Sequence, residues 1–267
     1  MTYIIIRLPC QSSFCISTNS TNLIELLKQW YGKYCYLYHD GNRSINCKHI
    51  EVLQYEQGYR LKWNDNIIST SNPLLEIHRI VFQNTEYTDG ILALHGCAVE
   101  WNKKAQVFLA PTTAGKTTLT SFLCSHGFGY ITDDCILLDT NTHKVHPYST
   151  PIHLRKDGFS ILENYNANPV NCDIITEPFM ERMLYTPKIC VKEPIPLERI
   201  YFMQRTENIC SCETMNANEK LINLLKSPIK EYPFTTAYMY ILVSLSKENC
   251  YRLFYSDMEY VEHILKS

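Results

Sequence analysis

Hydrophobic and polar positions over residues 1–71 follow a pattern that predicts a small amino-terminal α+β domain. Several apolar runs have the length and spacing of β-strands, and one stretch repeats its apolar residues every three or four positions, as an α-helix does. Asn19 or Ser20 can cap this helix, and Gly32 can end it. The predicted strands cover residues 2–8, 12–18, 50–55 and 59–63, and the predicted helix covers residues 19–32.

The pattern over residues 72–267 predicts a larger α/β domain. A helix with Asn72 as its cap and Pro73 in its first turn leads into this domain. A nearly unbroken apolar run at residues 104–110 is typical of a buried central strand, and a glycine-containing loop, a helix and another strand follow it. The predicted strands are 91–101, 104–110, 128–139, 199–205 and 250–256, and the predicted helices are 72–84, 117–127, 234–247 and 257–267.

Residues 158–195 show little periodicity. They are polar and contain several prolines. Long segments without secondary structure in a compact domain are usually functional. We therefore interpret this segment as an excursion that serves as a substrate-covering flap.

Composition and charge narrow the classes of function. Of the 267 residues, 45% are hydrophobic and 19% are charged, with a formal net charge of -2, as in an ordinary folded protein. No overall field attracts nucleic acid or an anionic membrane, and no apolar stretch is long enough to span a bilayer. The first residues lack the basic leader of a signal peptide, and the scattered cysteines indicate reduced thiols. We expect a cytoplasmic protein without nucleic-acid or membrane partners.

The stretch "LAPTTAGKTT" at residues 109–118 resembles a phosphate-binding loop. In the pattern G-x-x-x-x-G-K-[ST], backbone N–H groups surround the phosphates, the lysine reaches the β and γ oxygens, and the hydroxyl joins the Mg²⁺ shell. Ala110 replaces the first glycine of this pattern. An ordinary turn with an exposed lysine is the alternative, but the stretch lies between a buried-type strand and a helix N-terminus, where phosphate binding requires it. The residues expected to bind the nucleotide are Thr112, Thr113, Ala114, Gly115, Lys116, Thr117 and Thr118.

An acidic pair, Asp133 and Asp134, lies one strand beyond this loop. Phosphoryl transfer to a hydroxyl needs an acid that holds the metal and often a base that accepts the hydroxyl proton. Two adjacent carboxylates repel each other unless solvent or a cation such as Mg²⁺ separates their charges. A solvated turn is the alternative, but the apolar residues that follow argue against it. His95 lies in a strand expected beside the loop strand, although a lone histidine is more often structural.

The segments "LHGCAVE", "FLAPTTAGKTT", "HGFGYITDDCILLD" and "VHPYSTPIHLR" together resemble the HPr kinase/phosphorylase superfamily, in particular its shorter, lasso-peptide-type relatives encoded beside peptide-tailoring enzymes. The resemblance is close over residues 72–160 and loose over residues 197–267. It implies a P-loop kinase core like that of ATP-dependent phosphoenolpyruvate carboxykinase. Ala110, Thr118 in place of a glutamate, and the lack of a long glycine-rich C-terminal signature depart from the protein-directed kinases, which puts HPr itself in doubt as the substrate.

The resemblance also implies roles for individual residues. Lys116 and Thr117 would hold the phosphates and Mg²⁺. Asp133 would be the general base, and Asp134 would help to bind the metal. His95 would lie at the site of transfer.

The sequence thus predicts a Mg-ATP-dependent kinase that phosphorylates a Ser or Thr hydroxyl of a peptide or small protein, in ribosomal peptide tailoring. Arg155 is the candidate for an additional cation on the γ-phosphate, with an exposed arginine of no such role as the equal alternative. Two other functions stay open: a kinase for a small-molecule alcohol such as a free amino acid, and a nucleotide-binding module without catalysis. The oligomeric state also stays open.

Overall fold

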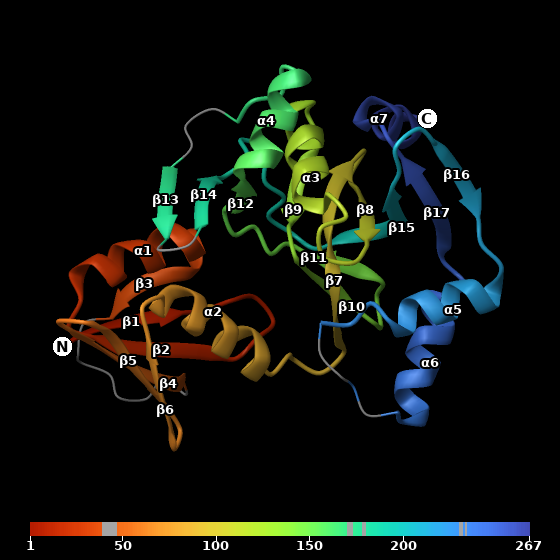
Figure 1. The fold of residues 1–267 in the computed structure, drawn as a ribbon. Helices are drawn as coiled ribbons and strands as arrows, with labels where there is room; N and C mark the ends of the chain where they lie inside the picture. Colours follow the sequence, from red (N-terminus) through yellow and green to blue (C-terminus); the bar gives the residue numbers. More distant parts are fainter. Residues whose placement is uncertain (39–46, 170–172, 178–179, 230–231, 233) are drawn as a thin grey trace. The chain divides into compact units, whose positions relative to one another are not determined.

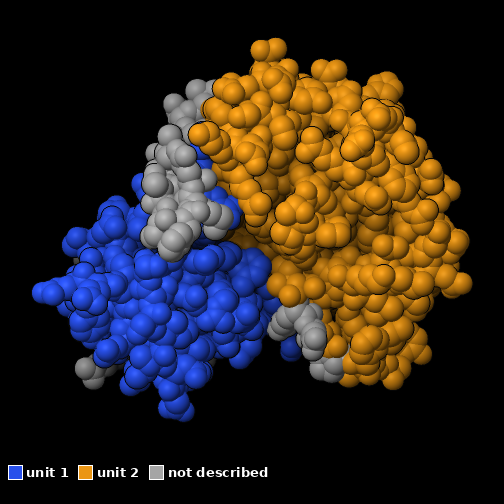
Figure 2. All heavy atoms as spheres, viewed as in Figure 1, with its two compact units in different colours: residues 1–89, 171–185 blue, residues 90–170, 186–267 orange. Residues whose placement is uncertain are grey.

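The computed structural model describes residues 1–38, 47–169, 173–177, 180–229, 232 and 234–267. Its fold is mixed α/β with several sheets. The chain divides into two compact units, one formed by residues 1–89 and 171–185 and the other by residues 90–170 and 186–267 (Figure 2). This division lies beyond the expected boundary between residues 71 and 72.

The first unit contains a six-stranded sheet with the order β3-β1-β2-β4-β5-β6 (Figure 1). Strands β2 and β4 run parallel, and the other neighbours run antiparallel. Its elements are β1 (Thr2–Ile6), β2 (Ser13–Thr18), α1 (Thr21–Tyr31), a 3₁₀ turn (Gly32–Tyr34), β3 (Cys35–Tyr38), β4 (Cys47–Tyr55), β5 (Gly58–Trp63), β6 (Asn66–Thr70) and α2 (Pro73–Asn84). An antiparallel hairpin of β13 (Asp173–Glu177) and β14 (Met180–Tyr185) also belongs to this unit.

Helix α2 is part of the first unit because its apolar face packs against α1 and β5. Ile77 and Val81 on this helix are fully buried. The Asn72 side chain caps the helix by accepting a hydrogen bond from the Leu75 N–H at 3.1 Å. These contacts move the boundary from the start of α2, where the sequence pattern changes, to a position after its end.

The second unit contains an eight-stranded sheet with the order β11-β10-β7-β8-β15-β17-β16, in which β9 also pairs with β7. Its strands are β7 (Ile91–Trp101), β8 (Lys104–Leu109), β9 (Gly129–Thr132), β10 (Cys135–Asp139), β11 (Lys144–His146), β15 (Ile195–Arg205), β16 (Ser211–Thr214) and β17 (Asn249–Tyr255). The unit also contains β12 (Ile152–Arg155), α3 (Lys116–Ser125), α4 (Lys156–Asn164), α5 (Ala217–Leu225), α6 (Thr236–Leu245) and α7 (Met258–Lys266). Helices α5 and α6 pack on the central strands through a shared apolar core.

The carboxyl ends of β8, β15 and β17 meet at one edge of this sheet, because these strands are mutually parallel. Phe202 of β15 pairs with Leu109, the last residue of β8, so residues 203–205 continue past the end of β8. Arg205 in turn pairs with Tyr255 at the end of β17. Such an edge is the usual place for ligand binding in open α/β sheets.

The described part of residues 158–195 contains regular structure, which corrects the expectation of an unstructured excursion. Helix α4 covers its start, the β13–β14 hairpin lies in its middle, and β15 begins at its end. Residues 170–172 and 178–179 lie outside the described residues, and nothing shows that this segment covers a substrate. Short elements held by long-range packing leave little periodicity in the sequence.

Helix α5 is a second element that the hydrophobic pattern missed. Asn216 and Glu219 form a reciprocal capping box at its start, a signal that was readable in the sequence.

Across the described residues, none of the helices combines the length and the apolar character needed to cross a membrane.

Candidate functional site

The loop between β8 and α3 uses a left-handed backbone at two positions. Thr113 has a φ of 71° and Gly115 a φ of 87°. Left-handed residues in a loop that opens a helix are typical of the concave N–H arrangements that bind anions. Ala110 has no positive φ. The loop therefore needs no glycine at the position where the motif has lost one.

Tyr255 supports the loop from the end of β17. Its buried hydroxyl group donates a hydrogen bond to the carbonyl oxygen of Ala114 at 3.0 Å. A Cβ atom on Gly115 would lie 2.6 Å from the same hydroxyl oxygen, so a larger residue does not fit there. Burial raises the pKa of Tyr255, which keeps the hydroxyl protonated as a donor.

The side chain of Lys116 lies inside the turn of the loop. It is only 5% exposed, and its Nζ atom donates to the carbonyl oxygens of Ala110 at 2.9 Å and Pro111 at 3.0 Å. The same Nζ atom lies 3.1 Å from Nε2 of His95. The structure thus brings together the predicted loop lysine and the predicted histidine.

His95 is neutral in this arrangement. The lysine ammonium group has no acceptor, so Nε2 of His95 must accept the hydrogen bond and the ring proton resides on Nδ1. The Nδ1–H group of the ring donates a hydrogen bond to the backbone carbonyl oxygen of Asp134. Burial first, and then the charge of Lys116, hold the pKa of His95 below its usual value.

The position of His95 follows from close strand packing. A Cβ atom on the next residue, Gly96, would collide with the carbonyl oxygen of Phe108, so glycine allows β7 and β8 to approach each other. On the other side of β7, His95 pairs with Cys135, the first residue of β10. The turn that carries the two aspartates therefore lies beside His95.

Asp133 is buried in this turn between β9 and β10. It is 6% exposed, and its Oδ1 atom has no hydrogen-bond partner. Burial, followed by the charge of Asp134, raises its pKa well above the usual range. A hydrogen bond from the Thr117 side chain and the charge of Lys116 oppose this rise.

Asp134 differs from its neighbour in exposure and in backbone. It is exposed, and its φ of 71° is left-handed, a conformation that Asp and Asn tolerate better than most residues. Its charge acts on His95, where it raises the pKa of the ring. The two carboxylates thus face different groups: Asp133 faces Thr117, and Asp134 lies near His95.

The residues around Thr117 fit a bound Mg²⁺ ion. Mg²⁺ prefers oxygen ligands and is usually held by one or two carboxylates together with substrate phosphates. The Thr117 hydroxyl and the unpartnered Oδ1 of buried Asp133 supply such oxygens. No cluster of three or more His, Cys, Asp or Glu side chains suited to a metal occurs in the described ranges.

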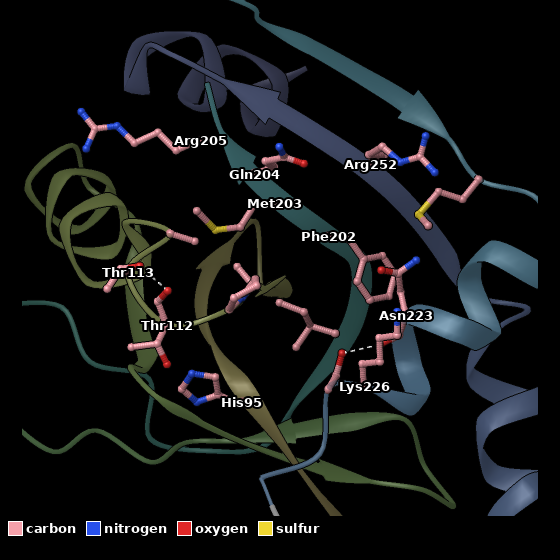
Figure 3. A pocket seen from close by; sticks show the side chains of 16 residues that line it. His95, Thr112, Thr113, Phe202, Met203, Gln204, Arg205, Asn223, Lys226 and Arg252 are labelled. Atoms are coloured by element: carbon pink, nitrogen blue, oxygen red, sulfur yellow. Dashed lines mark hydrogen bonds between the residues drawn. The ribbon is translucent and has the colours of Figure 1, made fainter. Parts of the chain in front are cut away.

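A pocket of about 600 Å³ opens beside the loop (Figure 3). It is lined by His95 and, from the loop, by Thr112, Thr113 and Ala114. The remaining lining residues come from the end of β15, from α5 and the residues after it, and from β17: Phe202, Met203, Gln204, Arg205, Asn223, Lys226, Ser227 and Arg252, together with Leu109, Ala110, Pro111 and Met215.

Arg155 does not line this pocket. It is exposed at the end of β12 and precedes α4, whose Gly158 packs near the Thr118 hydroxyl. Arg205 is the better-placed cation, because it lines the pocket and its Cδ atom is 4.0 Å from the position that a Cβ atom on Gly115 would take. Sequence reasoning missed Arg205 and Tyr255, although both end predicted strands whose parallel pairing would have pointed to them.

Comparisons with known proteins add little to this geometry. No family model matches the sequence, and no curated protein matches it. Among solved structures, the Hpr(Ser) kinase/phosphatase from Coxiella burnetii matches with a TM-score of 0.31 and 12% sequence identity, over 65% of this chain and 97% of that chain. This likeness is too distant to identify a family, so the function rests on the residues of the site.

Proposed function

We propose that this protein is a Mg-ATP-dependent kinase that transfers the γ-phosphate to a Ser or Thr hydroxyl of a peptide or small protein. The proposal is carried by one arrangement: Lys116 of the loop contacts neutral His95, and buried Asp133 lies next to Thr117 with one oxygen unpartnered. An ordinary structural turn gains nothing from a buried carboxylate with one unpartnered oxygen, since that state is unfavourable.

Each residue has a task in this proposal. Lys116 binds phosphate oxygens in exchange for the neutral acceptors that it contacts now. Thr117 and Asp133 would hold Mg²⁺, which would neutralise the charge of the β- and γ-phosphates. His95 keeps the lysine oriented through Nε2. Arg205 beside Gly115 is the additional cation in place of Arg155.

The contacts favour an exchange of the roles that the sequence predicts for the two aspartates. Asp133 accepts from Thr117 and is buried, as suits a metal ligand, whereas Asp134 is exposed near His95. In the proposed step, the acceptor oxygen bonds to the γ-phosphorus and the bond to the β–γ bridging oxygen breaks. ADP leaves with that bonding pair, and the hydroxyl proton passes to the Asp134 carboxylate.

A small-molecule acceptor is the second candidate. The pocket of about 600 Å³ lies within the 300–1,000 Å³ typical of small-molecule sites. A free hydroxy amino acid fits this volume as well as one residue of a peptide does.

The decisive measurement is intact-mass analysis after incubation with ATP, Mg²⁺ and candidate acceptors. The acceptors are any precursor peptide encoded beside the gene, free serine and free threonine, and Lys116→Ala is the control. We expect a gain of about 80 Da, one phosphoryl group, that Lys116→Ala abolishes. Tight ATP binding without consumption by any acceptor would instead establish a non-catalytic nucleotide-binding module.

The two aspartates are separated by their variants. Asp134→Asn should lower turnover by about a hundredfold or more while Mg-ATP still binds, as expected on loss of a general base. Asp133→Asn should weaken Mg-dependent ATP binding itself. The reverse pattern would restore the roles expected from the sequence, and near-wild-type turnover in both variants would refute the proposed chemistry.

A further inference from the structure

The pocket beside the loop is strongly cationic. Arg205, Lys226 and Arg252 line it, and none of its described lining residues is an aspartate or a glutamate. Figure 3 shows Arg205 on one side of the pocket and Asn223 and Lys226 on the other, with Met203 between them in this view. Arg205 lies beside Gly115 and can serve the nucleotide phosphates. Lys226 and Arg252 come from other elements, the end of α5 and β17.

The backbone of Lys226 is held in place, although the residue is exposed. It is the C-cap of α5, and buried Leu224 packs this helix end into the core. The next residue, Ser227, accepts a hydrogen bond from the His95 N–H at 2.7 Å through its carbonyl oxygen. The helix end is thus tied to the strand that carries His95. Within the described part of the chain, no acidic side chain pairs with Lys226.

Arg252 differs from Lys226, because Glu219 of α5 partly neutralises it. Their ion pair measures 2.8 Å between Nη2 and Oε1, and both side chains are more than a third exposed. Phe202 pairs with Arg252 across β15 and β17, and Met215 adds a second apolar surface to the pocket. This side of the pocket therefore offers an apolar surface, the Lys226 ammonium group, which has no acidic partner among the described residues, and the Arg252 guanidinium group, which Glu219 partly neutralises.

The side of the loop that faces the pocket indicates what binds there. The pocket is lined by Thr112, Thr113 and Ala114 and by His95, the partner of Lys116, but not by Thr117 or Thr118. In a phosphate-binding loop the lysine reaches the β- and γ-phosphates. The pocket thus lies beside the part of the loop where the transferred phosphate would be, and not beside the first residues of α3.

We propose that Lys226, assisted by Arg252, binds an anionic group of the phosphate acceptor, either a carboxylate or a phosphate, and so directs the acceptor hydroxyl toward His95 and the loop. The identification of the ligand as an acceptor rests on the proposed kinase function. The anion site itself rests only on the pocket, its charges and its apolar wall.

The test compares charged and neutral ligands of the same shape by saturation-transfer NMR titration, with and without Mg-ADP. The pairs are N-acetyl-L-serine with N-acetyl-L-serinamide, and D-glycerate with glycerol; glycerol 3-phosphate distinguishes phosphate from carboxylate. We expect at least one anion to bind about tenfold or more tightly than its neutral counterpart, the scale of a hydrogen bond to a charged group. Lys226→Gln should abolish this preference, whereas Lys247→Gln, an exposed lysine outside the pocket, should not.

A second variant should change affinity in the opposite direction. Glu219→Gln keeps an acceptor in the capping box but removes the charge that occupies Arg252, so anion affinity should rise several-fold. Equal binding of acid and amide, binding unaffected by Lys226→Gln, or binding of neither ligand would overturn the anion site. A rise in the Kd for ATP in Lys226→Gln without loss of anion binding would also overturn it. These titrations need no turnover, so they are independent of the phosphate-transfer assay with Lys116→Ala.

Discussion

Asp133 combines a proposed role in metal binding with a penalty to stability. Its carboxyl group is 6% exposed, and one oxygen has no partner. Burial and the neighbouring Asp134 raise its pKa in the folded protein. A carboxyl group whose pKa is raised by folding favours the fold below its unfolded pKa, and this contribution is lost as pH rises through the folded pKa. At neutral pH, Asp133 therefore opposes folding.

Asp133→Asn should raise the Tm of the ligand-free protein. Removing the buried charge should raise the free energy of unfolding by about 1 kcal/mol or more. Since 1 kcal/mol shifts the Tm of a protein of this size by about 2–4 °C, we expect an increase of about 3 °C or more at pH 7.5. The increase should shrink as pH falls toward the ordinary carboxyl pKa. Thermal unfolding of both proteins across pH measures this.

Asp134→Asn is the matched control for stability. Asn also tolerates the left-handed backbone, and this side chain is already exposed, so the change in Tm should be smaller. A lower Tm for Asp133→Asn than for the wild type at pH 7.5 would contradict the prediction.

The β8–α3 loop depends on an element that is distant in the sequence. Tyr255, at the end of β17, donates to Ala114 and occupies the space that a Cβ atom on Gly115 would need. Its position follows from the parallel pairing of β17 with β15, and of β15 with β8. The loop is therefore shaped by strand register as well as by its own residues.

Gly115→Ala places an alanine in a left-handed conformation and brings its Cβ atom against the Tyr255 hydroxyl group. These two effects together cost roughly 1–2 kcal/mol or more, so nucleotide affinity should fall by about tenfold or more. Tyr255→Phe alone should reduce affinity by about three- to tenfold through loss of one hydrogen bond. Combined, the two changes should be less harmful than their sum, because phenylalanine lacks the hydroxyl that meets the new Cβ.

Equilibrium titration with a fluorescent ADP analogue would measure this double-mutant cycle. Tyr240→Phe, which alters a 72% exposed tyrosine on α6, is the control and should leave affinity unchanged. Strict additivity of the two changes would show that Tyr255 does not constrain Gly115.

At the scale of the whole molecule, the chain contributes non-contiguous segments to each unit. Residues 171–185 belong with the amino-terminal unit, although they lie within the sequence of the second unit. Helix α2 also belongs to the amino-terminal unit, with Leu74, Ile77 and Val81 in its core. A fragment cut at residue 72 would expose this apolar face.

The fragments 72–267 and 90–267 provide a test of the boundary. Both lose the amino-terminal sheet and both keep residues 171–185, so they differ only in α2 and the residues after it. We expect fragment 72–267 to give the lower soluble yield and to aggregate more in size-exclusion chromatography, because exposed apolar surface drives association. Equal yield and monodispersity would place the boundary near residue 72, as the hydrophobic pattern predicts.

Sequence patterns located most of the elements that build the second unit. The predicted helices at 234–247 and 257–267 contain α6 and α7. The predicted strand 199–205 is the carboxyl-terminal part of β15, and the predicted strand 250–256 covers all of β17 except its first residue. Caps, turns and apolar periodicity are local properties that depend on residues a few positions apart, so they are readable from the chain. The short strands β3, β6 and β16 escaped prediction because sheet pairing, not local pattern, stabilises them.

By itself, the sequence determined the residue types and the spacing of the loop and the acidic pair, and it predicted their chemistry from these. Only the tertiary structure decided which of them meet. It placed His95 against Lys116, separated Asp133 from Asp134 by burial, and left Arg155 outside the pocket. Arg205 reached the loop instead, because parallel strand register joins residues that are remote along the chain. Burial and register arise from packing of the whole unit, and no local pattern encodes them.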